Sequence, residues 1–180
     1  LLVDLDNNGH RDLFVCNGIY KDVTDQDFVN FLGNEENQAA AESGEEIDFE
    51  GFVDRMPSRK IPNYAFANSG NLQFEDASRD WGLDRPTHSN GAAYSDLDGD
   101  GDLDLVVNNV NAPALLYRNR TSERAEGQSL IFDLRLNGDN THAVGSRITV
   151  FRSADQIVYD HMPMKGFQSS MDYRVVIGIG

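Results

Sequence analysis

Asp96-Leu97-Asp98-Gly99-Asp100-Gly101-Asp102-Leu103-Asp104 is the stretch of this 180-residue sequence that says most about its fold. Carboxylates occupy every second position, and Gly101 stands sixth, where a tight turn favours a residue without a side chain. Calcium binds about 6–8 oxygen ligands, and such loops supply them from alternate positions. The stretch therefore predicts a calcium loop, and a solvated acidic turn is the alternative. The predicted ligands are Asp96, Asp98, Asp100, Asp102 (through its backbone carbonyl) and Asp104.

A second copy of this pattern, Asp4-Leu5-Asp6-Asn7-Asn8-Gly9-His10-Arg11-Asp12, lies 92 residues earlier. The match continues beyond the loop at the same offset, pairing Leu13 with Leu105 and Val15 with Val107. Asn8 lowers the charge of this copy, so the solvated turn is a stronger alternative here. The predicted ligands are Asp4, Asp6, Asn8, His10 (through its carbonyl, not its imidazole) and Asp12.

The residues after each loop exclude an EF-hand. That motif needs a bidentate glutamate at position 12 and a helix after the loop. Position 12 is Val15 in one copy and Val107 in the other, and both lie in apolar, β-branched runs that predict buried strands. Each loop is therefore expected to connect two strands.

This arrangement resembles the calcium-binding FG-GAP/VCBS repeats of integrin-α-like β-propellers. Residues 63–76 predict a hairpin with a Ser-Gly turn, residues 91–94 a strand before the second loop, and residues 114–119 a strand after it. The resemblance implies that residues 1–18 end one repeat and that residues 61–120 form a complete one. Propellers typically have at least about four blades, so this sequence would supply only part of one.

Residues 19–60 exceed what one blade needs and are expected to be a helical and acidic insertion. Apolar residues at helical spacing predict short amphipathic helices at residues 25–32 and 49–56. Residues 34–46 between them are acidic, rich in alanine and without periodicity, which indicates a mobile segment. The insertion is interpreted as structural, and a partner-binding face is the alternative.

From about Ser129 the sequence alternates in the manner of β-strands. Residues 143–150, residues 166–170 and the ending Ile177-Gly178-Ile179-Gly180 resemble an ASPIC/UnbV domain, here over 128–180 and truncated. Such domains commonly follow VCBS repeats in the CRTAC1-like family of bacterial surface and animal matrix proteins. No enzymatic activity follows from this resemblance.

Composition narrows the possible functions. The net charge of −15 argues against a nucleic-acid surface, which would need a basic face. No apolar run approaches the roughly 18 residues of a membrane span. The single cysteine, Cys16, excludes an intrachain disulfide. No Gly-x-Ser-x-Gly nucleophile motif occurs, although a triad assembled only in space stays open. Leu1 and the abrupt end at Gly180 indicate a piece of a longer protein.

These observations predict a mainly β fold: a partial β-propeller with calcium-loop blades, a short helical insertion and a small C-terminal β domain. The predicted function is that of a non-catalytic calcium-binding structural or interaction module, secreted or on the cell surface, with Ca2+ as its cofactor. Its expected partner is a protein or glycan ligand, and neither nucleic acid nor a membrane span is expected. The alternative is a polysaccharide-acting enzyme, or an accessory domain of one, with structural calcium.

Overall fold

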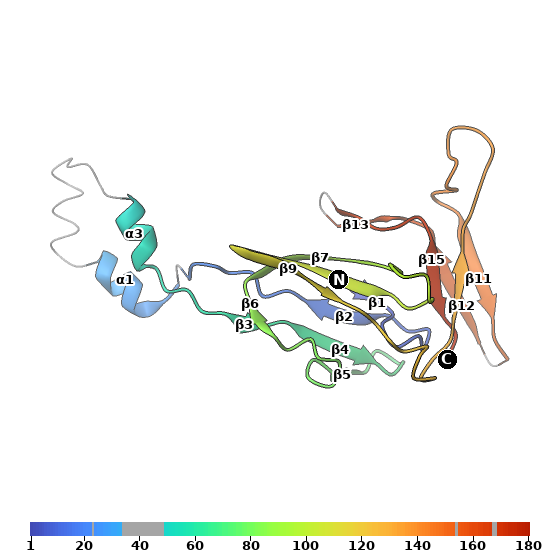
Figure 1. The fold of residues 1–180 in the computed structure, drawn as a ribbon, viewed down its shortest axis with the longest axis horizontal. Coiled ribbons are helices and arrows are strands. Elements are labelled where there is room, and N and C mark those ends of the chain that lie inside the picture. The colour runs from blue at the N-terminus through green and yellow to red at the C-terminus, as the bar shows by residue number, and fades with distance from the viewer. Residues whose placement is uncertain (23, 34–48, 154, 167–168) are drawn as a thin grey trace.

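The computed structural model describes residues 1–22, 24–33, 49–153, 155–166 and 169–180. Its strands form small antiparallel sheets, with two short helices at one end of the molecule (Figure 1). The expectation of a mainly β chain is therefore confirmed. None of the helices in the described ranges is both long enough and apolar enough to cross a membrane.

Two sheets carry the two acidic loops. The first sheet contains β1 (Leu2–Val3), β2 (Asp12–Val15), β4 (Tyr64–Asn68) and β5 (Phe74–Asp76), hydrogen-bonded in that order. The second contains β7 (Ser89–Ser95), β8 (Asp104–Asn109) and β9 (Ala112–Tyr117). The strands β3 (Ile61–Pro62) and β6 (Pro86–Thr87) pair separately.

Strands pair in equivalent registers within each of the two sheets. Leu2 faces Leu13 in the first sheet, and Tyr94 faces Leu105 in the second, which preserves the offset of 92 residues. The next strand also matches, because Leu13 faces Phe66 as Leu105 faces Tyr117. Each acidic loop therefore closes a hairpin between the first two strands of its sheet. Residues 61–120, predicted as one repeat, contribute strands to both sheets.

The two matching sheets differ in how their second strand connects to the next. A turn at Val110 and Asn111, with Asn111 at φ 52°, joins β8 to β9. Between β2 and β4 the chain instead passes through α1 (Gln26–Leu32) and α3 (Phe49–Arg55), which confirms the two predicted helices. The acidic segment 34–46, expected to be mobile, lies outside the described residues.

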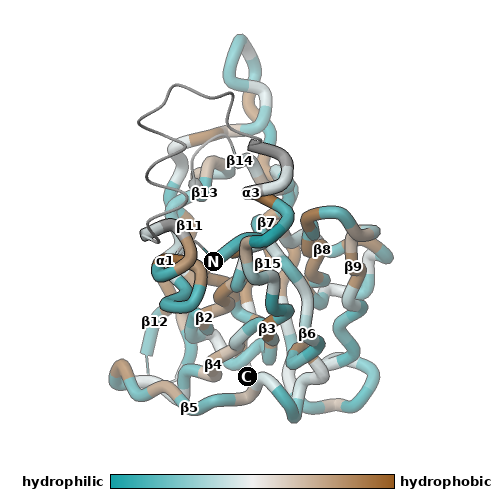
Figure 2. Tube along the Cα trace, turned by 90° about the vertical axis from the view of Figure 1, so that its left-hand side faces the viewer, coloured by the Kyte–Doolittle hydropathy of each residue, from teal (hydrophilic) through white to brown (hydrophobic). Residues whose placement is uncertain are grey.

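A shared apolar core lies between the two sheets. Phe14, Ala65 and Val107 are fully or almost fully buried, and Val3, Leu5, Leu103 and Leu105 pack with them. In Figure 2 the hydrophobic residues follow strands such as β2, β8 and β9. Alternation along these strands turns their apolar side chains inward and holds the polar loops at one end of the core.

The C-terminal strands pack against this core through one strand. In the chain order they are β10 (Ser129–Phe132), β11 (Arg147–Phe151), β12 (Gln156–Asp160), β13 (Met164–Gly166), β14 (Ser169–Ser170) and β15 (Val175–Gly178). They pair as β10–β15, β11–β12 and β13–β14. Val176 of β15 joins the core of the two sheets, whereas Val175 and Ile177 join a second core with Ile148. Side chains on the two faces of β15 therefore pack into two different hydrophobic cores.

Candidate metal centre in two matching loops

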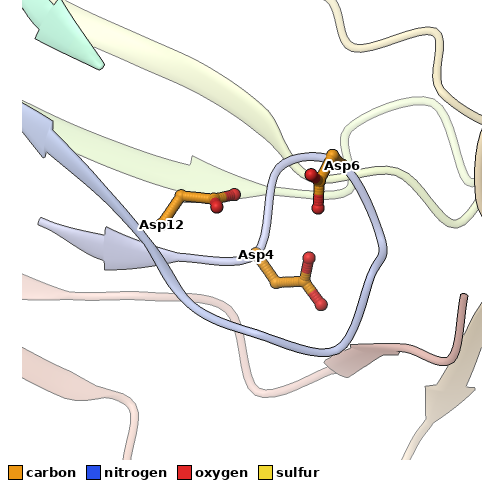
Figure 3. Close-up of side chains that lie close together, drawn as sticks. All are labelled: Asp4, Asp6 and Asp12. Carbon is orange, nitrogen blue, oxygen red and sulfur yellow. The ribbon is translucent and has the colours of Figure 1, made fainter. Parts of the chain in front are cut away.

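The first loop gathers three carboxylates. Asp4 follows β1, Asp12 begins β2, and Asp6 lies in the loop between them. One carboxylate oxygen from each lies within 4.8 Å of the others. Figure 3 shows the three side chains turned toward the interior of the loop. Oxygen atoms collected at this separation are a donor set suited to a hard cation.

The second loop gathers three carboxylates in the same way. Ligand atoms of Asp96, Asp98 and Asp100 also lie within 4.8 Å of one another. Asp96 is buried, whereas Asp98 is exposed. Asp4 and Asp6 of the first loop occupy the same loop positions as Asp96 and Asp98. The third carboxylate differs, because Asp12 stands ninth in its loop and Asp100 stands fifth, so the predicted ligand Asp104 lies outside the second cluster.

The aspartate at the ninth position braces each loop. Asp12 accepts hydrogen bonds from the backbone N–H of Leu5 at 2.8 Å and of Asn68 at 2.8 Å. Asp104 accepts the equivalent bonds from Leu97 at 3.0 Å and from Asn119 at 2.8 Å. Because both of its oxygens already accept N–H donors, this residue fixes the loop to the neighbouring strand.

Two asparagines that the sequence analysis did not select complete this bracing. The Asn68 side chain donates to the Arg11 carbonyl at 2.9 Å and accepts from the Gly70 N–H at 3.0 Å. Asn119 donates to the Leu103 carbonyl at 3.3 Å and accepts from the Thr121 N–H at 3.2 Å. A weak signal for them exists in the sequence: each follows an aromatic strand residue, Phe66 or Tyr117, by two positions. Their role depends on strand pairing, which that signal does not specify.

The loop backbones also match. Gly9 and Gly101, the predicted turn glycines, have φ values of 88° and 90°. The fourth position is left-handed too, with Asn7 at φ 58° and Gly99 at φ 82°. Asparagine is among the few residues with a side chain that adopt this region readily. The glycine position was predicted from the sequence, and the left-handed asparagine was not.

The remaining predicted ligands make other contacts. The Asn8 side-chain oxygen accepts from the His10 N–H at 2.7 Å, and its amide donates to Asp6 at 3.0 Å. The Asp102 carboxylate leaves its own loop, accepting from the Asn7 side chain at 2.7 Å and from the Ser122 N–H at 2.8 Å. Both oxygens of the Asp102 carboxylate are therefore occupied by hydrogen bonds, and the predicted role of its carbonyl stays a prediction.

The first loop holds its negative charges at an electrostatic cost. Burial, and then the charges of Asp12 and Asp6, raise the pKa of Asp4 from 3.8 to about 7. Burial also raises the pKa of Asp12 to about 6, against the lowering effect of the amides of Leu5 and Asn68. In the second loop, burial and neighbouring aspartates raise the pKa of Asp100. A bound cation would relieve this repulsion.

The donor set suits a hard cation, the class of ion to which calcium belongs. Every clustered ligand atom is a carboxylate oxygen, which hard cations prefer. Among the described residues, Asp4 Oδ1 is buried without a hydrogen-bond partner, and Asp100 Oδ2 has no hydrogen bond but lies 3.5 Å from Arg118 Nη2. Buried polar atoms are nearly always satisfied, so an unsatisfied carboxylate oxygen within a cluster is consistent with a metal ligand.

The C-terminal strands lie directly against the first loop. The Gly180 N–H donates to the Asn7 carbonyl at 2.9 Å, and Arg152 Nη1 donates to the Asn8 carbonyl at 3.2 Å. A β-carbon on Gly178 would lie 2.4 Å from Asp4 Oδ2. The first loop is therefore enclosed by a segment more than a hundred residues away in the sequence.

A serine and a histidine approach each other outside the loops. Ser58 Oγ lies 3.2 Å from His88 Nε2, and His88 Nδ1 is buried without a hydrogen-bond partner among the described residues. A catalytic triad needs a carboxylate at that nitrogen to orient the ring. Within the described part of the chain, this pair is not a triad.

The class of the C-terminal segment follows from comparison with known families. Residues 136–180 match the family described as ASPIC and UnbV. These residues include β11, β12 and β15, the strand that packs against the first loop. The chain therefore contains an ASPIC/UnbV domain at its C-terminal end.

Among curated proteins the chain is similar to cartilage acidic protein 1. The proteins of Mus musculus and of Homo sapiens are each 42% identical to it over 57 residues. This match covers 31% of the chain and 9% of each relative. The chain thus spans a small part of the length of these relatives.

Proposed function

We propose that this chain is a non-catalytic calcium-binding structural and interaction module, and that its two acidic loops each hold one Ca2+. The observation that carries the proposal is the duplication of the loop in three dimensions. Two segments 92 residues apart share strand register, left-handed positions, bracing bonds and the clustered carboxylates at loop positions one and three. Chance acidic turns have no reason to share all four features.

Asp4, Asp6 and Asp12 would hold the ion in the first loop, and Asp96, Asp98 and Asp100 would hold it in the second. The ion supplies positive charge, and the chain supplies a braced loop and buried oxygens. Because such an ion binds the folded loop and not the unfolded chain, it stabilises the fold by RT ln(1 + [Ca]/Kd). Calcium would therefore keep the loop end of the two sheets in place.

We further propose that the two sheets are FG-GAP/VCBS-type blades of a β-propeller completed by other segments. Support comes from the repeated hairpin, from the C-terminal ASPIC/UnbV domain and from the similarity to cartilage acidic protein 1. The same similarity and the calcium loops support a secreted or cell-surface location. Extracellular calcium modules typically have Kd values of about 0.1–1 mM, a range that suits such a location. The partner there would be a protein or a glycan.

Calorimetric titration of metal-stripped protein with Ca2+ tests the proposal. We expect two binding steps and a melting temperature that rises with calcium concentration. Mg2+ at equal concentration is the control, because it demands a smaller, more regular octahedral site. Absence of both heat and thermal shift at millimolar Ca2+ would overturn the proposal.

A further inference from the structure

Arg118 distinguishes the second loop from the first. Its Nε lies 2.7 Å from Asp98 Oδ2, and its Nη2 lies 3.5 Å from Asp100 Oδ2. Both contacted carboxylates belong to the three-carboxylate cluster of the second loop. A guanidinium group therefore already neutralises part of the charge that a calcium ion would neutralise.

The first loop lacks this arrangement. The register that aligns Leu13–Phe66 with Leu105–Tyr117 places Ala67 at the position of Arg118. In the part of the chain that the structure describes, no arginine or lysine forms an ion pair with Asp4, Asp6 or Asp12. Arg152 donates to the Asn8 carbonyl and forms its ion pair with Asp155. The charge of Asp4 contributes to raising the pKa of Arg152, but the two residues form no ion pair.

We infer that Arg118 is a built-in counter-ion of the second loop, which makes that loop stable without metal and lowers its affinity for calcium relative to the first. The inference rests on the proposed calcium function. A fixed positive charge that contacts two ligands repels an incoming divalent ion. Calcium must therefore displace the guanidinium or bind beside it, and either event weakens binding.

Arg118 is free to leave when calcium binds. Its side chain is 47% exposed, and it also pairs with Glu123 at 2.6 Å. Glu123 lies outside the loop, so the guanidinium group can keep this ion pair when it leaves Asp98 and Asp100. Calcium therefore fills the first loop at a lower concentration, and it fills the second loop only at a higher concentration. Counting acidic residues alone gives the opposite order, because the second loop carries more of them.

The test is a two-site calcium titration of R118Q with R120Q as the matched control. Arg120 is 58% exposed and lies 3.8 Å from Glu123, and no ion pair links it to a loop carboxylate among the described residues, so R120Q removes the same charge elsewhere. The double variant D98A/D100A shows which calcium-binding step belongs to the second loop, because that step should be absent from its titration. We expect R118Q to tighten this step roughly tenfold and to leave the other step unchanged. R120Q and the charge-preserving R118K should stay within about threefold of wild type.

Thermal melting supplies a second readout. R118Q should melt at a lower temperature than R120Q in chelator, and calcium should remove this difference. A variant that folds only when calcium is present would support the inference, and one that fails to fold in both conditions would overturn it. A second-loop step that weakens or does not change in R118Q would also overturn it, because Arg118 would then hold Asp98 in place for the ion. Wild-type protein with no calcium step at all would instead overturn the proposed function itself.

Discussion

The side-chain amide of Asn7 donates a hydrogen bond to the carboxylate of Asp102 at 2.7 Å and thereby joins the two acidic loops. Both residues are almost completely buried, with exposed fractions of 1% and 0%. The opposite oxygen of Asp102 accepts from the N–H and the hydroxyl of Ser122. The two loops therefore share one buried polar network.

Two substitutions of Asn7 separate this hydrogen bond from the backbone conformation. Asn7→Gly removes the bond but accepts φ 58°, and should cost about 1–3 kcal/mol because Asp102 keeps a buried oxygen without its donor. Asn7→Ala should cost roughly 1 kcal/mol more, since alanine is strained in the left-handed region. Urea denaturation measures both. Equal stability of the two variants would contradict the backbone part of this prediction.

The bracing asparagine Asn119 should contribute to the stability of the fold through its side-chain hydrogen bonds. Asn119→Ala removes donors to the Leu5 and Leu103 carbonyls and should destabilise the fold by about 1–3 kcal/mol. Asn108→Ala is the matched control, because its side chain makes an exposed bond to Asn90 and should change stability by less than about 0.5 kcal/mol. Comparable losses in the two variants would argue against the bracing role.

The double substitution Asp98→Ala with Asp100→Ala should abolish calcium binding at the second loop and preserve it at the first. These two side chains supply most of the carboxylate cluster beside Asp96. Asp133→Ala with Asp139→Ala removes the same charge from exposed positions and should leave both binding steps in place. Calorimetry measures the number of sites. Full calcium uptake by the first double variant would refute the assignment of the loop.

Gly178 should be needed for the C-terminal strands to lie on the first loop. The β-carbon of Gly178→Ala would meet Asp4 Oδ2 and the Asn7 carbonyl carbon, each at 2.4 Å. We expect a loss of about 1–3 kcal/mol from this overpacking. Calcium binding at the first loop should also weaken. Gly91→Ala, whose β-carbon meets nothing within 4 Å, is the control, and a similar effect from both would rule out the clash as the cause.

Metal-free protein should lose stability as the pH rises toward neutrality. The pKa of Asp4 is about 7 in the fold against 3.8 ordinarily, so between these values the folded state holds a proton that the unfolded state has released. The contribution of Asp4 to stability is therefore greatest below its ordinary pKa and is lost as the pH rises through about 7, and that of Asp12 is lost as the pH rises through about 6. Saturating calcium should reverse the trend, because it binds the ionised carboxylates. Melting curves from pH 5 to pH 8 with and without calcium make the comparison, and parallel curves would contradict it.

Strands and turns could be predicted from the sequence because they depend on local patterns. The apolar runs at 13–15 and 105–107, the hairpin of residues 63–76 and both helices lie where alternation, helical spacing and turn residues place them. The acidic loops could be found for the same reason. The alternating acidic or amide residues and the turn glycine of each loop all lie within nine consecutive residues. Alternating carboxylates around a turn glycine are the pattern that predicts a calcium loop.

The partners of these loops could not be predicted from the sequence, because they come from distant segments. Strand pairing brings Asn68 and Asn119 to the ninth-position aspartates, and β15 brings Gly178 to Asp4. Arg118 reaches Asp98 only because β9 runs beside β8. The sequence alone determined where the two acidic loops lie. The tertiary structure decided how deeply their carboxylates are buried and which groups contact them, since burial and nearby charges depend on residues that meet only in the fold.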